Sequence, residues 1–348
     1  MRVLIVKLSS MGDLVQALPA VTDAARAIPN IMFDWAVDES FAEIPQWHSA
    51  VNTIHKTAHR RWRKNLWSVI RSGELKQFYQ SLRTTEYDLV IDAQTNIKSA
   101  VVTALSEGIK CGPDKDSVRE YGAHWAYDRH FCVSKDQLAI SRCRSMFSQI
   151  LGYDSPTTPI DFGLGSIVWQ EPAVVLPTKP FLVFVHNASW VTKQWDDSNW
   201  HDLLIRAKLE GFQVMLPWGS EKEKAQAENL AEKHDHASVL PRLSLTDIGA
   251  VFKRSAGAVC MDTGLAHIGA ALNVPMVTLY GPTNPALIGA YGDHSAHIYD
   301  KVFPCMPCYK KQCAVEGYVG PQAQCLKAIA ADQVWDLLVS KQKEITTI

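Results

Sequence analysis

The sequence predicts an α/β protein with two Rossmann-like domains. Apolar, strand-like runs alternate along the chain with segments of helical period, which is the pattern of parallel α/β sheets. The length of 348 residues fits two domains of ordinary size, each able to bury a core. A stretch rich in Pro, Thr and Gly interrupts the alternation after Gly152. We expect an N-terminal domain over residues 1–165, a linker over 166–180, a C-terminal domain over 181–330 and a final helical segment over 331–348.

The N-terminal half begins with a strand, a turn and a helix. Residues 3–7 are typical of a buried strand, and residues 9–12 of a tight turn. Apolar side chains then recur at helical spacing from Leu14 to Ile28, until Pro29 ends the helix. Further strands are expected at 32–37 and 87–91, with helices near 68–84, 96–106 and 136–151.

The C-terminal half repeats this alternation. Strands are expected at 181–185, 212–216, 257–261 and 276–280, and helices at 198–210, 221–233, 244–254, 264–272 and 331–344. Ligands of open parallel sheets bind beyond the carboxyl ends of the strands. Two such domains therefore predict a site in a cleft across which they face each other.

Composition excludes several classes of protein. With 35 basic and 36 acidic side chains, the net charge of -1 argues against a general binder of nucleic acids or membrane surfaces. No apolar run approaches the roughly 20 residues that span a bilayer, and Lys7 and Asp13 interrupt any signal peptide. We expect a cytoplasmic protein. The charge is locally uneven, because residues 55–83 hold eight Lys or Arg against the single acid Glu74.

The first turn carries Ser10, Gly12 and Asp13. A glycine lets a ligand approach the backbone, and the start of a helix favours an anion. Asp13 has two interpretations: a helix-capping carboxylate, or a general base that takes a proton from an acceptor hydroxyl. The motif GxGxxG is absent from the sequence, which argues against a dinucleotide-binding dehydrogenase or epimerase.

Residues 59–64 read His-Arg-Arg-Trp-Arg-Lys. Such a run is either a solvated helix face or a site for an anion, because Arg pairs bidentately with carboxylate and phosphate. An acidic sugar or a phosphate group would fit it. A nucleic acid fits less well, since the rest of the chain offers no broad basic surface.

In the second half, residues 260–267 read Cys-Met-Asp-Thr-Gly-Leu-Ala-His and lead from a strand into a helix. The backbone amides of Thr263, Gly264 and Leu265 are placed to hold phosphate oxygens. We expect Asp262 to brace this turn or to accept from a sugar hydroxyl, and His267 to be a packed or hydrogen-bonded histidine. The turn at 280–284 places Thr283 beside the same cleft.

Two further polar residues follow strands of this half. Lys193 is either a surface lysine or a positive charge that meets a diphosphate. Glu223 is either an acid in the first turn of a helix or an acceptor for both hydroxyls of a ribose.

Four of the eight cysteines are clustered. Cys305, Cys308, Cys313 and Cys325 have the count of a four-thiolate structural zinc site, although their spacing is not that of a standard zinc ribbon. The alternatives are reduced core thiols or a disulfide. Nothing else in the sequence requires a catalytic metal.

The order of these motifs resembles a known family. Residues 2–13, the run 60–64, the pairs 91–94 with 97–100 and 261–267 with 280–283 are similar to the ADP-heptose:lipopolysaccharide heptosyltransferases of glycosyltransferase family 9. The resemblance covers nearly the whole chain. It is closest to the members that add the first heptose to the Kdo of the inner core.

The resemblance implies a GT-B fold and an inverting, metal-independent transfer of L-glycero-D-manno-heptose from ADP-heptose to Kdo-bearing lipid A, without a cofactor. It implies that the enzyme contacts the cytoplasmic face of the inner membrane peripherally. Asp13 would be the catalytic base. The residues implied on the acceptor side are Ser10, Gly12, Arg60, Arg61, Arg63, Lys64 and Arg119. The residues implied on the donor side are Ser189, Lys193, Glu223, Asp262, Thr263, Gly264, Leu265 and His267.

Two departures leave alternatives open. Ala188 and Ser189 stand where these first heptosyltransferases carry two threonines, and the cysteine cluster is similar to that of other members, including second heptosyltransferases. The acceptor can thus hold one phosphorylated Kdo or two Kdo units. The remaining alternatives are a family 9 enzyme with a different inner-core acceptor, and a non-catalytic protein that binds a nucleotide sugar.

Overall fold

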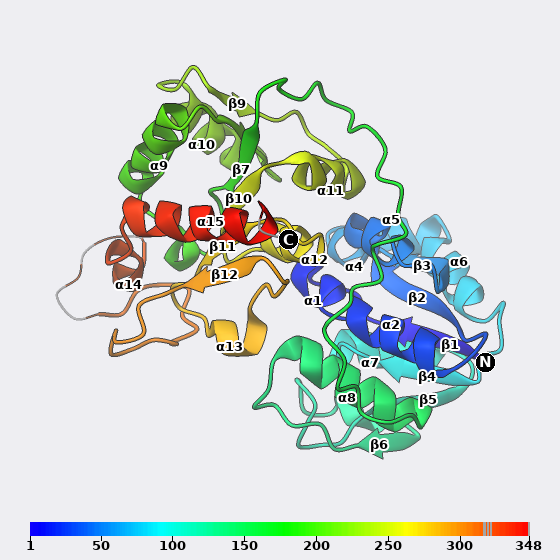
Figure 1. The fold of residues 1–348 in the computed structure, drawn as a ribbon. Helices are drawn as coiled ribbons and strands as arrows, with labels where there is room; N and C mark the ends of the chain where they lie inside the picture. The colour runs from blue at the N-terminus through cyan, green and yellow to red at the C-terminus, as the bar shows by residue number, and fades with distance from the viewer. Residues whose placement is uncertain (316–317, 319, 321, 347–348) are drawn as a thin grey trace. The chain divides into compact units, whose positions relative to one another are not determined.

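The chain folds into two compact units, Met1–Ile167 and Val168–Ile348 (Figure 1). The structure is a computed structural model that describes residues 1–315, 318, 320 and 322–346. Each unit contains a six-stranded parallel sheet, with strand orders β3-β2-β1-β4-β5-β6 and β12-β11-β10-β7-β8-β9. The chain starts each sheet near its middle and winds outward in both directions. The predicted α/β class with two Rossmann-like sheets is confirmed.

Unit 1 places helices on both faces of its sheet. Its strands are β1 (Arg2–Val6), β2 (Met32–Asp38), β3 (Val51–Thr57), β4 (Leu89–Asp92), β5 (Ile109–Pro113) and β6 (Arg129–Phe131). Its helices are α1 (Met11–Val15), α2 (Leu18–Ala27), η1 (Glu39–Phe41), α3 (Glu43–Gln46), α4 (His59–Trp62), α5 (Leu66–Arg71), α6 (Glu74–Leu82), α7 (Ile97–Leu105), η2 (Ala123–Ala126) and α8 (Ala139–Leu151).

Alternation along the strands of unit 1 assigns each side chain to one face. Leu4 and Val6 of β1 pack with Leu82 of α6 and Val102 of α7. On the opposite face α2 and α8 lie side by side, and Phe147 of α8 contacts Phe33 of β2 (Figure 1). The two layers therefore have separate cores on one sheet.

Two predicted helices of unit 1 are broken into shorter ones. The helix expected from Leu14 to Ile28 is α1 followed by α2, because Pro19 stands in the first turn of α2 and starts a new helix. The helix expected near 68–84 is α5 followed by α6. Gly73 joins them with a φ of 75°, a left-handed conformation that glycine adopts at little cost.

Unit 2 has the same layered plan. Its strands are β7 (Phe181–Val185), β8 (Gln213–Leu216), β9 (Ala237–Val239), β10 (Gly257–Met261), β11 (Met276–Leu279) and β12 (Ser295–Ile298). Its helices are η3 (Val191–Lys193), α9 (Asp197–Leu209), α10 (Glu221–Ala231), α11 (Leu245–Arg254), α12 (Gly264–Ala271), α13 (Pro285–Ile288), α14 (Gln324–Lys327) and α15 (Ala331–Thr346).

Neighbouring residues of β11 again point to opposite layers. Val277 belongs to the core built with α9, α10 and α15. Met276 faces the other layer, where its sulfur lies beside Gly269 of α12 and near Phe252 of α11. Every helix and strand expected between residues 181 and 280 is present within two residues of its predicted bounds. The short edge strands β9 and β12 were not predicted.

Residues 153–180, all of which the structure describes, contain neither helix nor strand. Their second half packs on unit 2: Trp169 lies against Gly249 of α11, and Glu171 pairs with Arg254 at 2.8 Å. Within the described part of the chain, no helix is both long and apolar enough to cross a membrane. All eight cysteines are free thiols.

His48 is buried between α2 and α3 in a neutral state. Its Nδ1 accepts from the Ala50 amide at 3.1 Å, and its Nε2 lies 3.0 Å from the Thr22 hydroxyl. Nδ1 can accept this bond only when it carries no proton. Burial lowers the pKa of His48 to about 4, with Asp161 opposing and Arg26 adding to the shift.

We predict that stability falls as the pH is lowered from about 6.5 to 4. The unfolded chain binds a proton on this histidine near pH 6.5, whereas the folded chain resists it until about pH 4. One such histidine lowers the free energy of unfolding by about 2 kcal/mol between pH 7 and pH 5. Chemical unfolding at both pH values should show a smaller loss for His48→Gln than for the wild type. Equal losses would contradict a neutral, buried His48.

Candidate active site

Some of the residues that the sequence singled out form one group in each unit, at the carboxyl ends of its strands. The N-terminal half-site is the turn Ser10–Asp13 with Arg119 and the loop 93–96. The C-terminal half-site is Lys193 with residues 262–265 and Thr283.

Asp13 lies in the first turn of α1, directly after the loop that leaves β1. The backbone amide of Ser10 donates to its Oδ2 at 2.9 Å, and the Ser10 hydroxyl donates to the same oxygen at 2.8 Å. The capping interpretation of Asp13 is therefore correct as a description of the fold. It does not compete with a chemical role, because both bonds use one oxygen and hold the carboxylate in a fixed orientation.

The loop before Asp13 is fastened to the neighbouring strand β4. The amides of Leu8 and Ser9 both donate to Oε1 of Gln94, at 2.5 and 2.9 Å. Lys7 Nζ donates to the carbonyl of Ala93 at 2.7 Å. Since Ala93 and Gln94 directly follow β4, this loop lies across the ends of two adjacent strands.

Asp92 holds the same loop through hydrogen bonds. This fully buried carboxylate accepts from the amides of Gln94 and Thr95 and from the hydroxyls of Ser99 and Tyr127, all within 2.9 Å. Burial raises the pKa of Asp92, although the four hydrogen bonds oppose the shift.

Arg119 is brought to this loop by Thr95. The Arg119 amide donates to the Thr95 hydroxyl at 3.1 Å, and the next amide donates to the Thr95 carbonyl. Thr95 has a φ of 63°, which turns the backbone toward Arg119. Arg119 therefore lies beside the loop that follows β4, and its role toward the acceptor stays a prediction.

The surroundings of Asp13 keep it ionised. Burial would raise the pKa of Asp13, but the positive charge of Lys7 and the hydrogen bonds from Ser10 outweigh burial. Arg119 lowers this pKa further, and the result lies below the ordinary value of an aspartate. A carboxylate that is ionised at neutral pH can accept a proton from a hydroxyl.

The basic run lies on α4 and just after it. Arg61 is already paired, with Glu39 at 3.0 Å and with Glu74 at 2.6 Å. The guanidinium of Arg60 stands 5.3 Å above the ring of Phe41. Arg63 and Lys64 are exposed. The run is thus not one uniform anion site, because its members differ in how much of their charge is already compensated.

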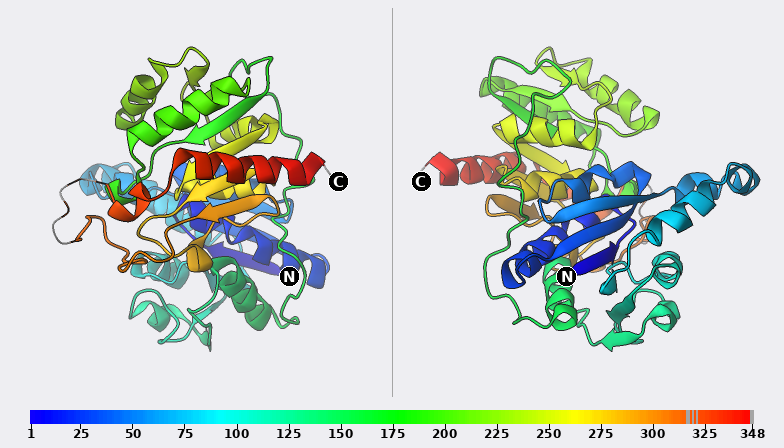
Figure 2. Two further views of the ribbon diagram at one scale, coloured as in Figure 1. Left: turned by 60° about the vertical axis from the view of Figure 1, so that its left-hand side comes forward. Right: turned by 90° about the vertical axis from the view of Figure 1, so that its right-hand side faces the viewer.

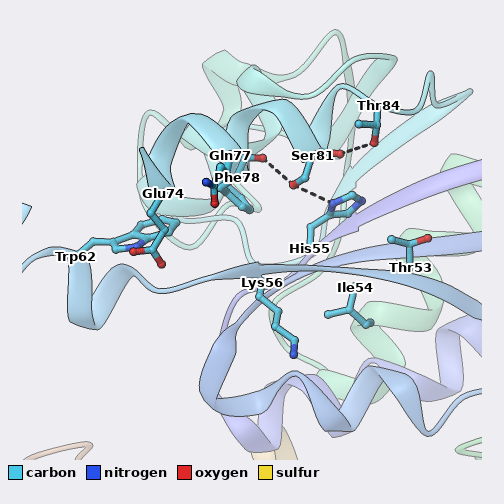
Figure 3. Close-up of a pocket in the computed structure, with 10 residues that line it drawn as sticks. All are labelled: Thr53, Ile54, His55, Lys56, Trp62, Glu74, Gln77, Phe78, Ser81 and Thr84. Atoms are coloured by element: carbon cyan, nitrogen blue, oxygen red, sulfur yellow. Dashed lines mark hydrogen bonds between the residues drawn. The ribbon is translucent and has the colours of Figure 1, made fainter. Parts of the chain in front are cut away.

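A cavity of about 450 Å³ adjoins this run between β3 and α6 (Figure 3). Trp62 and Glu74 line one end, and His55 lies between the strand and Ser81 of the helix, 3.3 Å from its hydroxyl. None of its ten lining residues belongs to the predicted site. The sequence could not indicate this cavity, because β3 was not recognised as a strand.

In unit 2, Lys193 and Asp262 form an ion pair at the carboxyl ends of β7 and β10. Lys193 Nζ lies 2.6 Å from Asp262 Oδ2, and the side chains are only 13% and 6% exposed. The Thr283 hydroxyl donates to the same oxygen at 2.5 Å. Asp262 therefore braces three loops, which agrees with the bracing role expected for it.

The turn after Asp262 leads into α12. Thr263 is the residue before the helix, and Gly264 and Leu265 open it, so their amides belong to the unpaired first turn. This turn lies beside the Lys193 ammonium because Asp262 contacts it directly. A positive charge and the start of a helix together favour a phosphate group.

Trp190 is a neighbour of this group that the sequence did not indicate. Its ring lies 4.8 Å from Lys193 Nζ and 5.7 Å from Lys311 Nζ. Lys311 reaches this position because the carbonyl of Lys310 accepts from the Thr192 hydroxyl at 2.8 Å. The half-site therefore holds two cations on one aromatic ring.

The other donor-side residues have different surroundings. Glu223 caps α10 by accepting from the amides of Gly219 and Ser220, at 2.7 and 3.1 Å. His186, which directly follows β7 and is not one of the predicted residues, has its pKa lowered by burial to about 4, against the opposing effect of hydrogen bonds to the backbone of Glu223 and Phe184. His267 is buried on α12, and Ser189 follows β7 in the same loop as Ala188.

A metal centre has no support in the described residues. Among them, no group of three or more His, Cys, Asp or Glu side chains is arranged to hold a metal ion. Burial, with the nearby thiols Cys305, Cys308 and Cys313, raises the pKa of Cys325 to about 11. The disulfide alternative is wrong, since all four are free thiols. The zinc site stays a prediction.

Comparison with known proteins gives consistent matches over most of the chain. The profile of glycosyltransferase family 9 (heptosyltransferase) matches residues 75–319. Lipopolysaccharide heptosyltransferase 1 of Pseudomonas aeruginosa is 47% identical over 317 residues, which cover 91% of this chain and 88% of that protein. The Salmonella typhimurium protein of the same name is 45% identical over 293 residues, covering 84% and 92%.

A solved structure, E. coli heptosyltransferase WaaC with ADP, is similar with a TM-score of 0.85. The identity is 37%, and the match covers 98% of this chain and 100% of that one. WaaC with ADP-2-deoxy-2-fluoro heptose matches with a TM-score of 0.82 at 36% identity, covering 98% and 99%. The expected GT-B fold is confirmed by this likeness.

We predict that Gln94 controls the order of the loop before Asp13. Gln94→Leu removes the acceptor of two backbone amides, and each buried amide left without a partner costs about 1–3 kcal/mol. Hydrogen exchange at the Leu8 and Ser9 amides should accelerate about ten- to a hundredfold. The matched control is Gln80→Leu at an exposed position of α6. Unchanged exchange in Gln94→Leu would show that the loop is held by other contacts.

Proposed function

Because the chain belongs to glycosyltransferase family 9, the heptosyltransferases, we propose that it transfers heptose from ADP-heptose to the Kdo of the lipopolysaccharide inner core. The activity is that of a lipopolysaccharide heptosyltransferase 1. The observation that carries this proposal is the likeness to enzymes of that name over most of the chain. The assignments of individual residues below are part of the proposal.

The N-terminal half-site binds the acceptor. Asp13 faces the attacking hydroxyl of Kdo with its carboxylate held by Ser10. Arg63 and Lys64, exposed beside α4, pair with the carboxylate of Kdo or with a phosphate on it. Arg61 contributes by exchanging one of its two glutamate partners for the acceptor. Arg119 lies near enough to Asp13 to affect its charge and contacts the same sugar.

The C-terminal half-site binds the donor. The amides of Thr263, Gly264 and Leu265 hold oxygens of the diphosphate, and Lys193 supplies the positive charge. Glu223 accepts from the ribose hydroxyls with Oε1, since the amides of Gly219 and Ser220 both donate to Oε2. Ser189 and His267 complete the donor side.

The transfer is a single displacement. The acceptor oxygen forms a bond to the anomeric carbon of heptose while the bond from that carbon to the diphosphate oxygen breaks. The hydroxyl proton goes to Asp13, and the electron pair of the broken bond leaves with ADP. Lys193 and the helix amides stabilise the charge that develops on the leaving diphosphate. Attack from the side opposite the leaving group inverts the anomeric centre.

The cell location follows from the acceptor. Kdo-bearing lipid A is anchored in a membrane, so the enzyme works at the cytoplasmic face of the inner membrane as a peripheral protein.

Release of ADP from ADP-heptose, measured with and without Kdo-bearing lipid A, tests the proposed function. Acceptors with one phosphorylated Kdo and with two Kdo units separate the two acceptor types. A chain that binds ADP-heptose and releases no ADP with either acceptor would be a binding protein instead.

Replacement of the base should abolish transfer without unfolding the chain. Asp13→Asn keeps the shape of the side chain but removes its negative charge, so we expect kcat to fall about 10²- to 10⁴-fold. Affinity for ADP and the midpoint of thermal unfolding should stay near wild type. An Asp13→Asn enzyme with wild-type turnover would remove Asp13 from the reaction.

Replacement of the basic run should affect the acceptor more than the donor. In Arg63→Ala, loss of one charge-assisted hydrogen bond raises the KM for Kdo-bearing lipid A about tenfold or more. Arg61→Ala should act in the same direction, with an added structural effect from its unpaired glutamates. Lys135→Ala, an exposed cation of unit 1 between β6 and α8, is the control. Equal losses for acceptor and ADP-heptose would place the acceptor site elsewhere.

A further inference from the structure

Large apolar side chains are exposed on one helical layer of unit 1. Trp67 and Ile70 of α5 are 85% and 54% exposed. Tyr121 and Trp125, around η2, are 74% and 76% exposed. On the opposite layer, whose helices α2 and α8 the structure describes in full, no large apolar side chain is exposed to this degree. The exposure is therefore a property of one face.

The helices that carry these side chains form one continuous layer. Val69 of α5 packs with Trp62, and Phe78 of α6 joins that cluster. Phe78 also packs with Val102 of α7 in the core above the sheet. Ala123 of η2 packs with Ala100 of α7. In Figure 2 (right), α5 and α6 extend outward at the β3 edge of this layer.

The side chains of α5 lie on an inner, buried side and an outer, exposed side of the helix. Val69 is buried, whereas Trp67 and Ile70 are three residues apart and share the outer side. Arg71, four residues after Trp67, stands on the same outer side and is exposed. The outer side of α5 thus combines an aromatic, an aliphatic and a basic side chain.

On this layer, exposed basic side chains outnumber the exposed acids that have no cationic partner. Arg63, Lys64, Arg71 and Lys98 are exposed. Among its acids, Glu74 and Glu107 pair with arginines, whereas Glu120 is exposed and caps α7 by accepting from the Ile97 amide. On the opposite layer Arg26 pairs with Asp161, and Arg144 pairs with Asp23.

We propose that this layer of unit 1 docks on an anionic lipid surface, with Trp67, Ile70, Tyr121 and Trp125 at the level of the headgroups. Tryptophan and tyrosine prefer the interface between water and bilayer, and exposed Lys and Arg are attracted to anionic headgroups. The inference rests on the proposed function, since it supplies the surface that meets a membrane-anchored acceptor. Docking places the acceptor-binding residues Arg63 and Lys64, next to α5, close to the headgroups.

Vesicle sedimentation tests the surface without any substrate. The full chain is mixed with vesicles of phosphatidylethanolamine and phosphatidylglycerol, or of phosphatidylcholine alone. We expect binding to the anionic vesicles that weakens with added salt, and about tenfold weaker binding for Trp67→Gln/Ile70→Gln. The matched control is Leu209→Gln, a 73% exposed leucine on α9 of unit 2, which should bind as the wild type does.

Three outcomes would overturn the proposal. These are no binding of the wild type to anionic vesicles, equal binding to both kinds of vesicle, and equal loss in the Leu209→Gln control. Light scattering without lipid gives an independent check. A concentration-dependent dimer that Trp67→Gln/Ile70→Gln abolishes would show that a second copy of the chain covers this face instead.

Turnover separates this inference from the proposed function. With a water-soluble, de-acylated Kdo acceptor, the double variant should release ADP as fast as the wild type, because neither side chain lies in the proposed reaction site. With Kdo-bearing lipid A in anionic vesicles it should be about tenfold slower at low enzyme concentration. A wild type that binds vesicles but releases ADP with neither acceptor would contradict the proposed function and would not contradict the docking surface.

Discussion

Both half-sites depend on a buried aspartate at the carboxyl end of a central strand. Parallel strands end at one edge of a sheet, so several loops with unpaired amides and hydroxyls meet there, and these groups need partners. Asp92 satisfies four such donors after β4. Asp262, after β10, takes the Thr283 hydroxyl and the Lys193 ammonium. A single acceptor in each unit thus fixes the loops that carry the proposed chemistry.

The two aspartates differ in the charge of their partners, and this difference suits the two roles proposed. Asp92 has neutral partners and a raised pKa, so it organises the loop beside Asp13 through hydrogen bonds alone. Asp262 holds Lys193 in place, and this lysine is also proposed to bind the diphosphate. An ammonium has three donors, so Lys193 can keep its contact with Asp262 while it donates to a phosphate oxygen. The ion pair therefore orients the Lys193 ammonium and leaves it able to donate to a phosphate oxygen.

The fold could be predicted from the sequence where strands are continuous apolar runs, and not where they are short or partly exposed. β7 and β10 are continuous apolar runs and were predicted at their observed bounds. β3 is half exposed, with the sequence Val-Asn-Thr-Ile-His-Lys-Thr, and was missed with the cavity it lines. The pairing of Arg61 with Glu39 and Glu74 was equally invisible, because it joins side chains 22 and 13 residues apart. The turns after the strands could be located because ligands of parallel sheets bind at the carboxyl ends of the strands, and the roles of their residues stay predictions.

The basic stretch at residues 55–83 contributes side chains of two kinds, some paired with acids and some exposed without an acidic partner. Arg61, paired with two glutamates, fixes α4 against α6, while Arg63, Lys64 and Arg71 keep uncompensated charge outside. A near-zero net charge leaves the rest of the chain without attraction to anionic surfaces, so a local excess decides which face approaches one. Since the same stretch contains exposed Trp67 and the proposed acceptor residues, the face proposed to dock on a lipid surface is also the face proposed to bind a lipid-anchored sugar acid. Orientation at the surface and acceptor selection then share one determinant.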